Sequence, residues 1–559
     1  MITPPLISQV SVEVYERRCE TSLLIGDHAE AIVQATLALA AFPETPKAYE
    51  MLLKVLAKTG EEGEMITLWE NFHKKFPEDA MKDLLLEEIC WGVLRKGGKS
   101  DRLQTKLIAL IGAALNQDIY AVKALKEALN DSSTVIRNVA TELSAHYGDA
   151  ELQEEIAAKF LQEKSWDVRE ALLGAIGELK IRSLLPELMK LTRNPSVSSE
   201  EKREAIKTIS LLHEKPQRAE LQDLVSSRWS SERSLACKLI AEYGLDQEQD
   251  LLSTLLKDSH REVKREALLA WGRLRLFPSE HIQEMAISKD PLIALLASWI
   301  LLLGDPEKGE ELIAKWLLHD KEDVRLFAAS VVAGSGEYGI PIAKQMIDQS
   351  KDAYVRANLA LVLLKQRVEV KKSSEILYEF LHGHREQLMI KKEPFPLIQK
   401  SNVRHGALIS DLPEVINQVS RLEILNLLAI VEYPKASSAI REFLKKGRWE
   451  VVGVAAETLL GEGDESAIAL VQELLNDPDR EIRLESALLL AVWGRDKQAL
   501  PLLMEAYPTA DRTMKIKILE ALGRLGEREA IPFLLKGLKD PSQLFRIISA
   551  SVLIQTLNH

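Results

Sequence analysis

A basic residue returns along most of this chain at steps of about 31 residues, and its local setting is the same each time. An apolar residue precedes it, and in many copies an alanine follows three positions later. The basic positions are Lys106, Arg137, Arg169, Arg203, Arg233, Lys264, Arg325, Arg356, Arg483, Lys515 and Arg546, with Ala294, Gly453 and Arg421 in the same register. A period of this length accommodates two helices of about 11 to 13 residues with two short turns. One such pair cannot bury its apolar face alone, so the period predicts stacked helix pairs.

Each position of the repeat has a physical interpretation. An aspartate six residues before the basic position is expected to accept hydrogen bonds from the free N–H groups that open the second helix; these are Asp131, Asp258, Asp477 and Asp540. The apolar residue before the basic one should point inward, and the alanine should permit close helix packing. The glycines near the end of the unit, Gly272, Gly304, Gly494 and Gly526, are expected to end the second helix.

Residues 1–80 follow a different period, of about 34 residues. Tyr15, Gly26 and Pro43 align with Tyr49, Gly60 and Pro77. A glycine suits the turn between two helices because it adopts positive φ without a Cβ clash. The segment resembles tetratricopeptide (TPR) repeats, because Gly26, Ala31, Ala38 and Pro43 stand at the spacing typical of that family. The second copy has Met65 and Phe72 in place of the two alanines.

The repeat of about 31 residues resembles the short HEAT repeats called phycobilisome-lyase-like. We therefore expect an all-α protein, a right-handed α-α superhelix (solenoid), with TPR-like helices and a closing helix over residues 1–97 and a HEAT-repeat array over 98–559. The array should hold about 14 to 15 repeats and be irregular at about 382–415. The resemblance also implies that turn aspartates and helix basic residues pair between neighbouring repeats as a structural ladder, formed by Asp131, Arg137, Asp258, Lys264, Asp477, Arg483, Asp540 and Arg546.

Composition narrows the environment and the class of partner. The formal net charge of -12 argues against a nucleic-acid binder, which needs a dominant positive field. The longest apolar run, Pro291–Gly304, is too short for a membrane span and predicts a helix buried on all sides. Three widely spaced cysteines without a C-x-x-C pair suit a reducing compartment, and the N-terminus carries no secretion signal. We expect a cytoplasmic protein with no membrane span.

No motif in the sequence makes a convincing catalytic or cofactor site. The segment Gly334–Gly339 fits G-x-G-x-x-G, but the repeat register places it after a helix, whereas a dinucleotide site needs a preceding strand. His213–Glu214 is the only His-Glu pair, whereas the HEAT-like di-iron hydroxylases need several. His382 and His384 are expected to be exposed turn residues. The sequence thus predicts no catalytic residue, no metal ligand and no cofactor.

Two groups of residues are candidates for binding a partner. The register fails between Arg356 and Arg421, where a proline-containing, locally basic segment is either a binding loop or a degenerate repeat. Its candidate residues are Lys391, Lys392, Phe395, Lys400 and Arg404. Trp166, Trp229 and Trp449 stand in turns just before their basic positions. Each of these tryptophans either packs over the end of its repeat or acts as a recognition anchor.

We therefore predict a non-enzymatic scaffold that binds protein partners, with the basic segment recognising an acidic or extended segment. A bilin-lyase-like or other cofactor-handling accessory enzyme, using a groove of the array, is the alternative that the HEAT resemblance implies. A HEAT-like DNA repair glycosylase would need a basic groove, which the scattered Lys and Arg residues do not provide.

Overall fold

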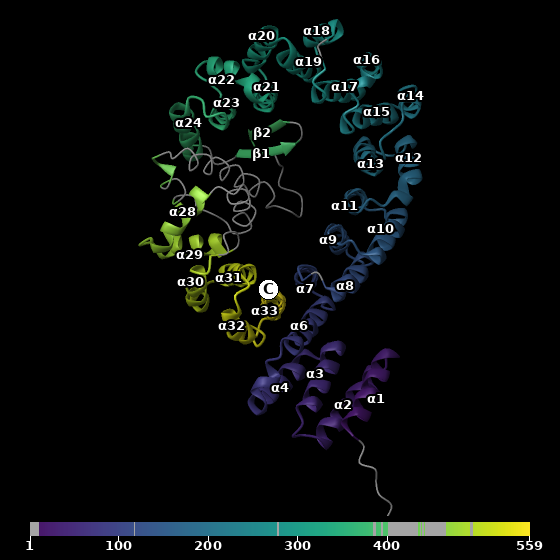
Figure 1. Ribbon diagram of the computed structural model, residues 1–559, viewed down its shortest axis with the longest axis vertical. Coiled ribbons are helices and arrows are strands. Elements are labelled where there is room, and N and C mark those ends of the chain that lie inside the picture. The colour runs from purple at the N-terminus through teal and green to yellow at the C-terminus, as the bar shows by residue number, and fades with distance from the viewer. Residues whose placement is uncertain are drawn as a thin grey trace, which may run out of the picture. The chain divides into compact units, whose positions relative to one another are not determined.

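A computed structural model describes residues 11–116, 118–276, 279–383, 387–392, 395–400, 434–436, 438, 441, 465–491 and 496–559 (Figure 1). The chain forms two compact units. Unit 1 combines both ends of the chain, Met1–Leu179 and Arg495–His559, and unit 2 is the intervening Lys180–Gly494. The domain boundary expected at residues 97–98 lies inside unit 1.

All the secondary-structure elements described in unit 1 are helices. Its helices are α1 (Val12–Leu24), α2 (His28–Ala41), α3 (Pro46–Thr59), α4 (Glu62–Lys75), α5 (Pro77–Ala80), α6 (Asp83–Gly98), α7 (Leu103–Ala114), α8 (Ile119–Leu129), α9 (Thr134–Ser144), α10 (Ala150–Gln162), α11 (Trp166–Glu178), α30 (Ala499–Ala506), α31 (Arg512–Leu525), α32 (Ile531–Gly537) and α33 (Gln543–Asn558). The interval from the start of α1 to that of α3 equals the interval from α2 to α4, and both match the first period. Gly26 and Gly60 have φ of 78° and 82°, the positive values expected at the two turns.

Unit 2 contains helix pairs and one hairpin. Its helices are α12 (Leu185–Arg193), α13 (Ser199–Leu212), α14 (Arg218–Val225), α15 (Ser230–Glu242), α16 (Gln249–Leu256), α17 (Arg261–Arg273), α18 (Glu280–Ala286), α19 (Pro291–Gly304), α20 (Pro306–Leu317), α21 (Glu322–Gly334), α22 (Ile340–Met346), α23 (Ala353–Lys365), α24 (Val370–Gly383), α28 (Glu465–Glu473) and α29 (Arg480–Leu489). Short 3-10 turns in the two units span Arg182–Leu184, Asp246–Glu248, Gly336–Gly339, Leu474–Asn476, Tyr507–Thr509 and Arg528–Ala530.

Within each unit, the second helices of successive repeats form a packed layer. From α9 to α23 their first residues follow one another at a nearly constant step of about 31 residues. Within unit 2, α13, α15, α17, α19, α21 and α23 each pack on the next. The apolar residues before the basic positions are buried, as predicted; they are Ile136, Val168, Val263, Val324, Val355, Ile482 and Phe545. The alanines three positions after it, Ala140, Ala236, Ala267, Ala297 and Ala328, are fully buried between helices. The fold is therefore an all-α superhelical repeat fold.

The apolar run Pro291–Gly304 forms α19, and every residue from Ile293 to Leu302 is buried. Helices on several sides cover it, because α17, α18, α20 and α21 all pack against it. The prediction of a helix buried on all sides is confirmed. In the described residues no helix combines the length and the apolar character that crossing a bilayer requires.

The prediction that a glycine near the end of the repeat ends the second helix is confirmed at Gly526 and wrong at Gly272. Gly526 ends α31 with φ of 64°, the left-handed conformation that favours glycine. Gly272, by contrast, lies inside α17, which runs on to Arg273. A Cβ on Gly272 would lie 2.0 Å from the ring of Trp299, so this glycine permits close packing of α19 and does not end the helix. Gly494 lies outside the described residues.

The irregular segment contains a two-stranded antiparallel hairpin, which the sequence analysis did not anticipate. Strand β1 (Gln387–Lys392) pairs with β2 (Phe395–Lys400). β2 packs against α21 and α23, two members of the second-helix layer, and Figure 1 shows the hairpin beside α21. β1 precedes the prolines of this segment, and β2 contains Pro396, which an edge strand tolerates.

Candidate functional site: the repeat ladder and the hairpin

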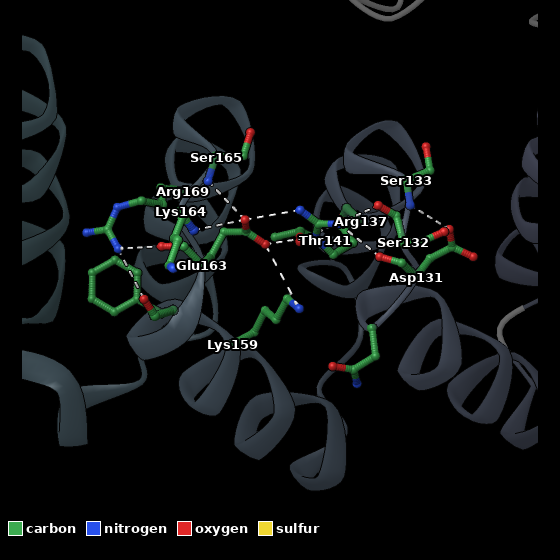
Figure 2. A network of polar contacts seen from close by, with 12 residues as sticks. Asp131, Ser132, Ser133, Arg137, Thr141, Lys159, Glu163, Lys164, Ser165 and Arg169 are labelled. Carbon is green, nitrogen blue, oxygen red and sulfur yellow. Dashed lines mark hydrogen bonds and ion pairs between the residues drawn. The ribbon is translucent and has the colours of Figure 1, made fainter.

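The ladder between repeats is best seen at Arg137, on α9 (Figure 2). Its Nε donates to Glu163 Oε2 at 2.8 Å and its Nη2 donates to Glu163 Oε1 at 3.1 Å. Its Nη1 donates to the carbonyl oxygen of Asp131, six residues earlier, at 2.9 Å. One guanidinium thus ties the turn of its own repeat to the turn that follows α10 in the next repeat. Bidentate pairs of this kind fix geometry as well as contributing energy.

The same bonding recurs at other basic positions. Arg233 Nε donates to Asp258 Oδ2 at 2.5 Å, and Arg325 Nη2 donates to Asp352 Oδ2 at 2.7 Å. Lys106 makes the simpler version, with Nζ 2.7 Å from Asp131 Oδ2. Arg169, Arg233, Arg325, Arg483 and Arg546 each donate Nη1 to the carbonyl oxygen six residues before them. The bond to the turn is therefore a property of the repeat, whereas the carboxylate partner comes from the following repeat.

Several predicted ladder residues lie in other arrangements. Asp477 pairs with Arg441, whose Nε donates to Asp477 Oδ2 at 2.8 Å. Within the described part of the chain, Arg483 donates to the carbonyl oxygens of Asp477 and Pro478 and to no carboxylate. Among the described residues, Lys264 makes no ion pair. The residue six positions before the next register position is Ser288, and the acid of that turn, Asp290, pairs with Arg261. The partner of a basic residue thus depends on which acid the next turn happens to carry.

The turn aspartates accept a backbone N–H bond, but its donor precedes the helix and is not one of the free N–H groups that were predicted. In each of the four turns the Oδ1 atom accepts from the N–H two residues later, at 2.8 Å; the pairs are Asp131 with Ser133, Asp258 with His260, Asp477 with Asp479, and Asp540 with Ser542. The donor is the N-cap residue of the second helix, one position before the first turn of that helix. The aspartate therefore fixes the chain as it enters the helix.

Glu163 is the most strongly perturbed acid of the ladder. Burial alone would raise the pKa of its carboxyl, but hydrogen bonds from Arg137 and from the N–H groups of Ser165 and Lys164 outweigh it and lower the pKa from 4.5 to about 2. Those two N–H groups lie 2.9 Å from Oε1. The charged carboxylate is thus strongly stabilised by the fold.

This pKa predicts acid sensitivity of unit 1. Because the folded pKa lies below the unfolded one, Glu163 stabilises the fold fully above about pH 4.5, and this contribution is lost as pH falls towards 2. The loss should reach about 3 kcal/mol. Thermal unfolding between pH 7 and pH 2.5 should show a smaller acid-dependent fall in Tm for Glu163→Gln than for the unchanged protein. Equal slopes for the two proteins would contradict the assignment.

Arg546 on α33, the last basic position, forms its ion pair with an acid near the other end of the chain. Arg546 Nε donates to Glu62 Oε1 at 2.6 Å, although 484 residues separate the two. Both residues belong to unit 1, and α33 packs there against α6 and α7. Sequence reasoning missed Glu62, because its position in the first period gives no sign of a partner so distant in the chain.

The hairpin carries four of the five candidate residues of the basic segment. The register places Lys391 opposite Pro396 and Lys392 opposite Phe395, with Lys400 opposite Gln387. Because alternate residues of a strand belong to opposite faces, Lys391 and Lys392 do not share a face of the sheet. Arg404 lies outside the described residues.

Two of the three candidate tryptophans are described, and both are half-buried. Trp166 is the first residue of α11, and Trp229 is the N-cap residue of α15. The guanidinium carbon of Arg228 lies 4.7 Å from the centre of the Trp229 ring, so this ring makes a local cation–π contact. Trp449 lies outside the described residues.

The glycine motif and the three cysteines lie in surroundings that indicate a structural role. Gly334–Gly339 spans the end of α21 and a 3-10 turn, with a helix before it and no strand. Burial raises the pKa of all three thiols, Cys19, Cys90 and Cys237, which keeps them protonated and poorly nucleophilic. In the part of the chain that the structure describes, no three His, Cys, Asp or Glu side chains gather as metal ligands would.

Comparison with protein families supports the repeat type. Residues 469–554 match the family of HEAT repeats. No curated protein matches the sequence. Similar solved structures include the Kap95:Nup1 complex, at 13% identity and a TM-score of 0.36, covering 96% of this chain and 82% of that chain. The myosin chaperone UNC-45 from C. elegans, in complex with a Hsp90 peptide, has 12% identity and a TM-score of 0.32, covering 98% and 81%.

A third similar structure is the complex of CpcE and CpcF of phycocyanin lyase from Nostoc sp. PCC7120. It has 15% identity and a TM-score of 0.23, with 54% of this chain and 95% of that chain covered. At these identities the likeness concerns the fold alone. From the matched repeats over residues 469–554, the spacing of the described helices and the bonds between neighbouring turns, we conclude that the chain is a helical-repeat protein that contains HEAT repeats.

Proposed function

We propose that the protein is a non-enzymatic scaffold that binds other proteins, and that the β1–β2 hairpin recognises an extended, acidic segment of a partner. The observation that carries the proposal is the hairpin itself, a strand pair packed on the second-helix layer of a repeat array that is otherwise helical in its described residues. A strand with an unpaired edge can bind an extended segment through backbone hydrogen bonds. In the described part of the chain the sheet has two strands, so each strand has one edge without a strand neighbour.

Charge supports the choice of an acidic segment. The two strands contain Lys391, Lys392 and Lys400 and no acidic residue, in a chain whose formal net charge is -12. A local excess of positive charge on an acidic protein attracts acidic partners, and the rest of the surface repels them. The helix pairs then serve as the framework that presents the hairpin.

Affinity capture with charge-reversed baits tests this proposal. The first bait is the tagged full chain, and the second carries Lys391→Glu, Lys392→Glu and Lys400→Glu. The matched control carries Lys190→Glu, Lys207→Glu and Lys308→Glu, which change the charge equally at exposed lysines of helices in unit 2. Captured proteins are identified by mass spectrometry, and the direct partner is then titrated against all three purified chains.

We expect the hairpin variant to bind its partner at least tenfold more weakly than the unchanged chain and the control variant, with the difference shrinking at high salt. Equal binding by the hairpin variant and the control would rule out the hairpin as the binding site. Capture of no protein by any of the three baits would contradict the scaffold function as a whole.

A further inference from the structure

The C-terminal repeat, which contains α32 and α33, packs on N-terminal helices of unit 1. An internal basic residue donates to an acid of the next repeat, 25 to 27 residues later at Arg137, Arg233 and Arg325. Arg546 instead donates to Glu62 at the start of α4. The side chain of Glu62 is 8% exposed and that of Arg546 is 23% exposed, so the pair is largely removed from water.

The Arg546 pair has the same bonding pattern as the internal pairs. Nε and Nη2 of Arg546 face the two carboxylate oxygens of Glu62, at 2.6 and 3.5 Å. Nη1 donates to the carbonyl oxygen of Asp540, six residues earlier, at 2.8 Å. Arg233 bonds Asp258 and the carbonyl of Ser227 in the same way, at 2.5, 3.0 and 2.9 Å. The docking of α33 on the N-terminal helices therefore reproduces a contact between neighbouring repeats.

Close packing of small residues supports this contact. Ser551 Oγ donates to the carbonyl oxygen of Gly112 at 3.0 Å, and a Cβ on Gly112 would lie 3.0 Å from Ser551 Cβ. A Cβ on Gly97 would lie 2.6 Å from Ile547 Cδ1. A side chain at either of these positions on α6 and α7 would crowd α33, so the two glycines permit its close approach.

Two further ion pairs border the same interface. Lys539 Nζ lies 2.6 Å from Glu70 Oε1, and Arg528 Nη2 lies 2.8 Å from Asp83 Oδ1. All three ion pairs place the basic member on the C-terminal segment and the acidic member on the N-terminal one. The two surfaces are therefore complementary in charge as well as in shape, a combination that defines partner and register.

We propose that the surface formed by α4, α6 and α7 is a docking site for the C-terminal repeat, and that a second copy of this chain can supply that repeat. Nothing in the contact depends on the two segments belonging to one molecule. They are joined only through unit 2, so the choice between one chain and two depends on the effective concentration that unit 2 provides. Exchange of an identical element between copies is a known low-cost route to a dimer.

Two full-length variants test the proposal. Glu62→Arg places two arginines at the junction of its own chain, and Arg546→Glu places two glutamates there. In a dimer that exchanges α33 between one copy of each variant, the introduced arginine would face the introduced glutamate, and the other junction would be the unchanged pair. The variants are unfolded in urea, mixed and refolded together, and mass is measured by size-exclusion chromatography with light scattering against the 62.7 kDa of one chain.

We expect a 1:1 dimer in the refolded mixture, at a fraction at least tenfold above that of either variant refolded alone. The double variant Glu62→Arg/Arg546→Glu should refold as a monomer, because its own junction is again complementary in charge. A mixture that stays as monomeric as its components would overturn the proposal. So would equal dimerisation of each variant by itself, because charge pairing would then not select the partner. Neither result bears on the hairpin, which this experiment leaves unchanged.

Discussion

Replacing Arg137 with alanine is expected to lower the free energy of unfolding of unit 1 by about 3 to 5 kcal/mol. The side chains of Arg137 and Glu163 are 13% and 5% exposed, so the substitution leaves a buried carboxylate without its guanidinium. It also removes the bonds to the carbonyl oxygens of Asp131 and Ser132. Urea unfolding followed by circular dichroism measures the change.

A double-mutant cycle separates the pair from the other contacts of each residue. We expect Arg137→Ala/Glu163→Ala to be less destabilised than the sum of the single variants, because the unpaired carboxylate is then absent. The matched control is Lys126→Ala, which removes the ion pair of Lys126 Nζ with Glu151 Oε2 at 2.7 Å. That pair also joins neighbouring repeats but is exposed, so its loss should cost about 0 to 1 kcal/mol. Equal costs at Arg137 and Lys126 would show that the buried ladder contributes no more than surface charge.

Replacing Gly309 with alanine is expected to destabilise unit 2 by about 3 kcal/mol. Gly309 is in the first turn of α20, and its Cα faces the backbone of α19. An added Cβ would lie 2.3 Å from Leu302 Cα and 2.4 Å from Leu302 N. A backbone in a fully packed helix cannot rotate aside as a side chain can, so α20 must move away from α19.

Gly174→Ala provides the control for this substitution. Gly174 lies in the middle of α11, is exposed, and has no atom within 4 Å of the position that a Cβ would take. There the alanine should stabilise the helix by about 1 kcal/mol, because it restricts the unfolded chain and favours helix. Thermal unfolding of both variants gives the sign of each effect directly. A stabilised Gly309→Ala protein would mean that α19 and α20 are not in close contact.

How much of the fold and of the ladder could be predicted from the sequence depends on how far apart in the chain the interacting residues lie. The register that places Ile136 and Ala140 in the core comes from one helical turn, and both residues are buried as predicted. The bond from the Ser133 N–H to the Asp131 carboxylate spans two residues, so it too could be anticipated. The hairpin could not, because its strands interrupt the helical period without the Asn-Gly or Asp-Gly turn that would have marked it.

The repeat, its two periods, the buried positions and the aspartate of the turn could all be predicted from the sequence. These features follow from local periodicity, which recurs in every copy of the unit. Only the tertiary structure decided which acid each basic residue meets: Glu163 for Arg137, Asp477 for Arg441, and Glu62 for Arg546. The physical reason is that an ion pair requires proximity in space and no fixed spacing along the chain. A partner 484 residues away therefore leaves no periodic trace, and it becomes visible only once the helices of unit 1 are packed.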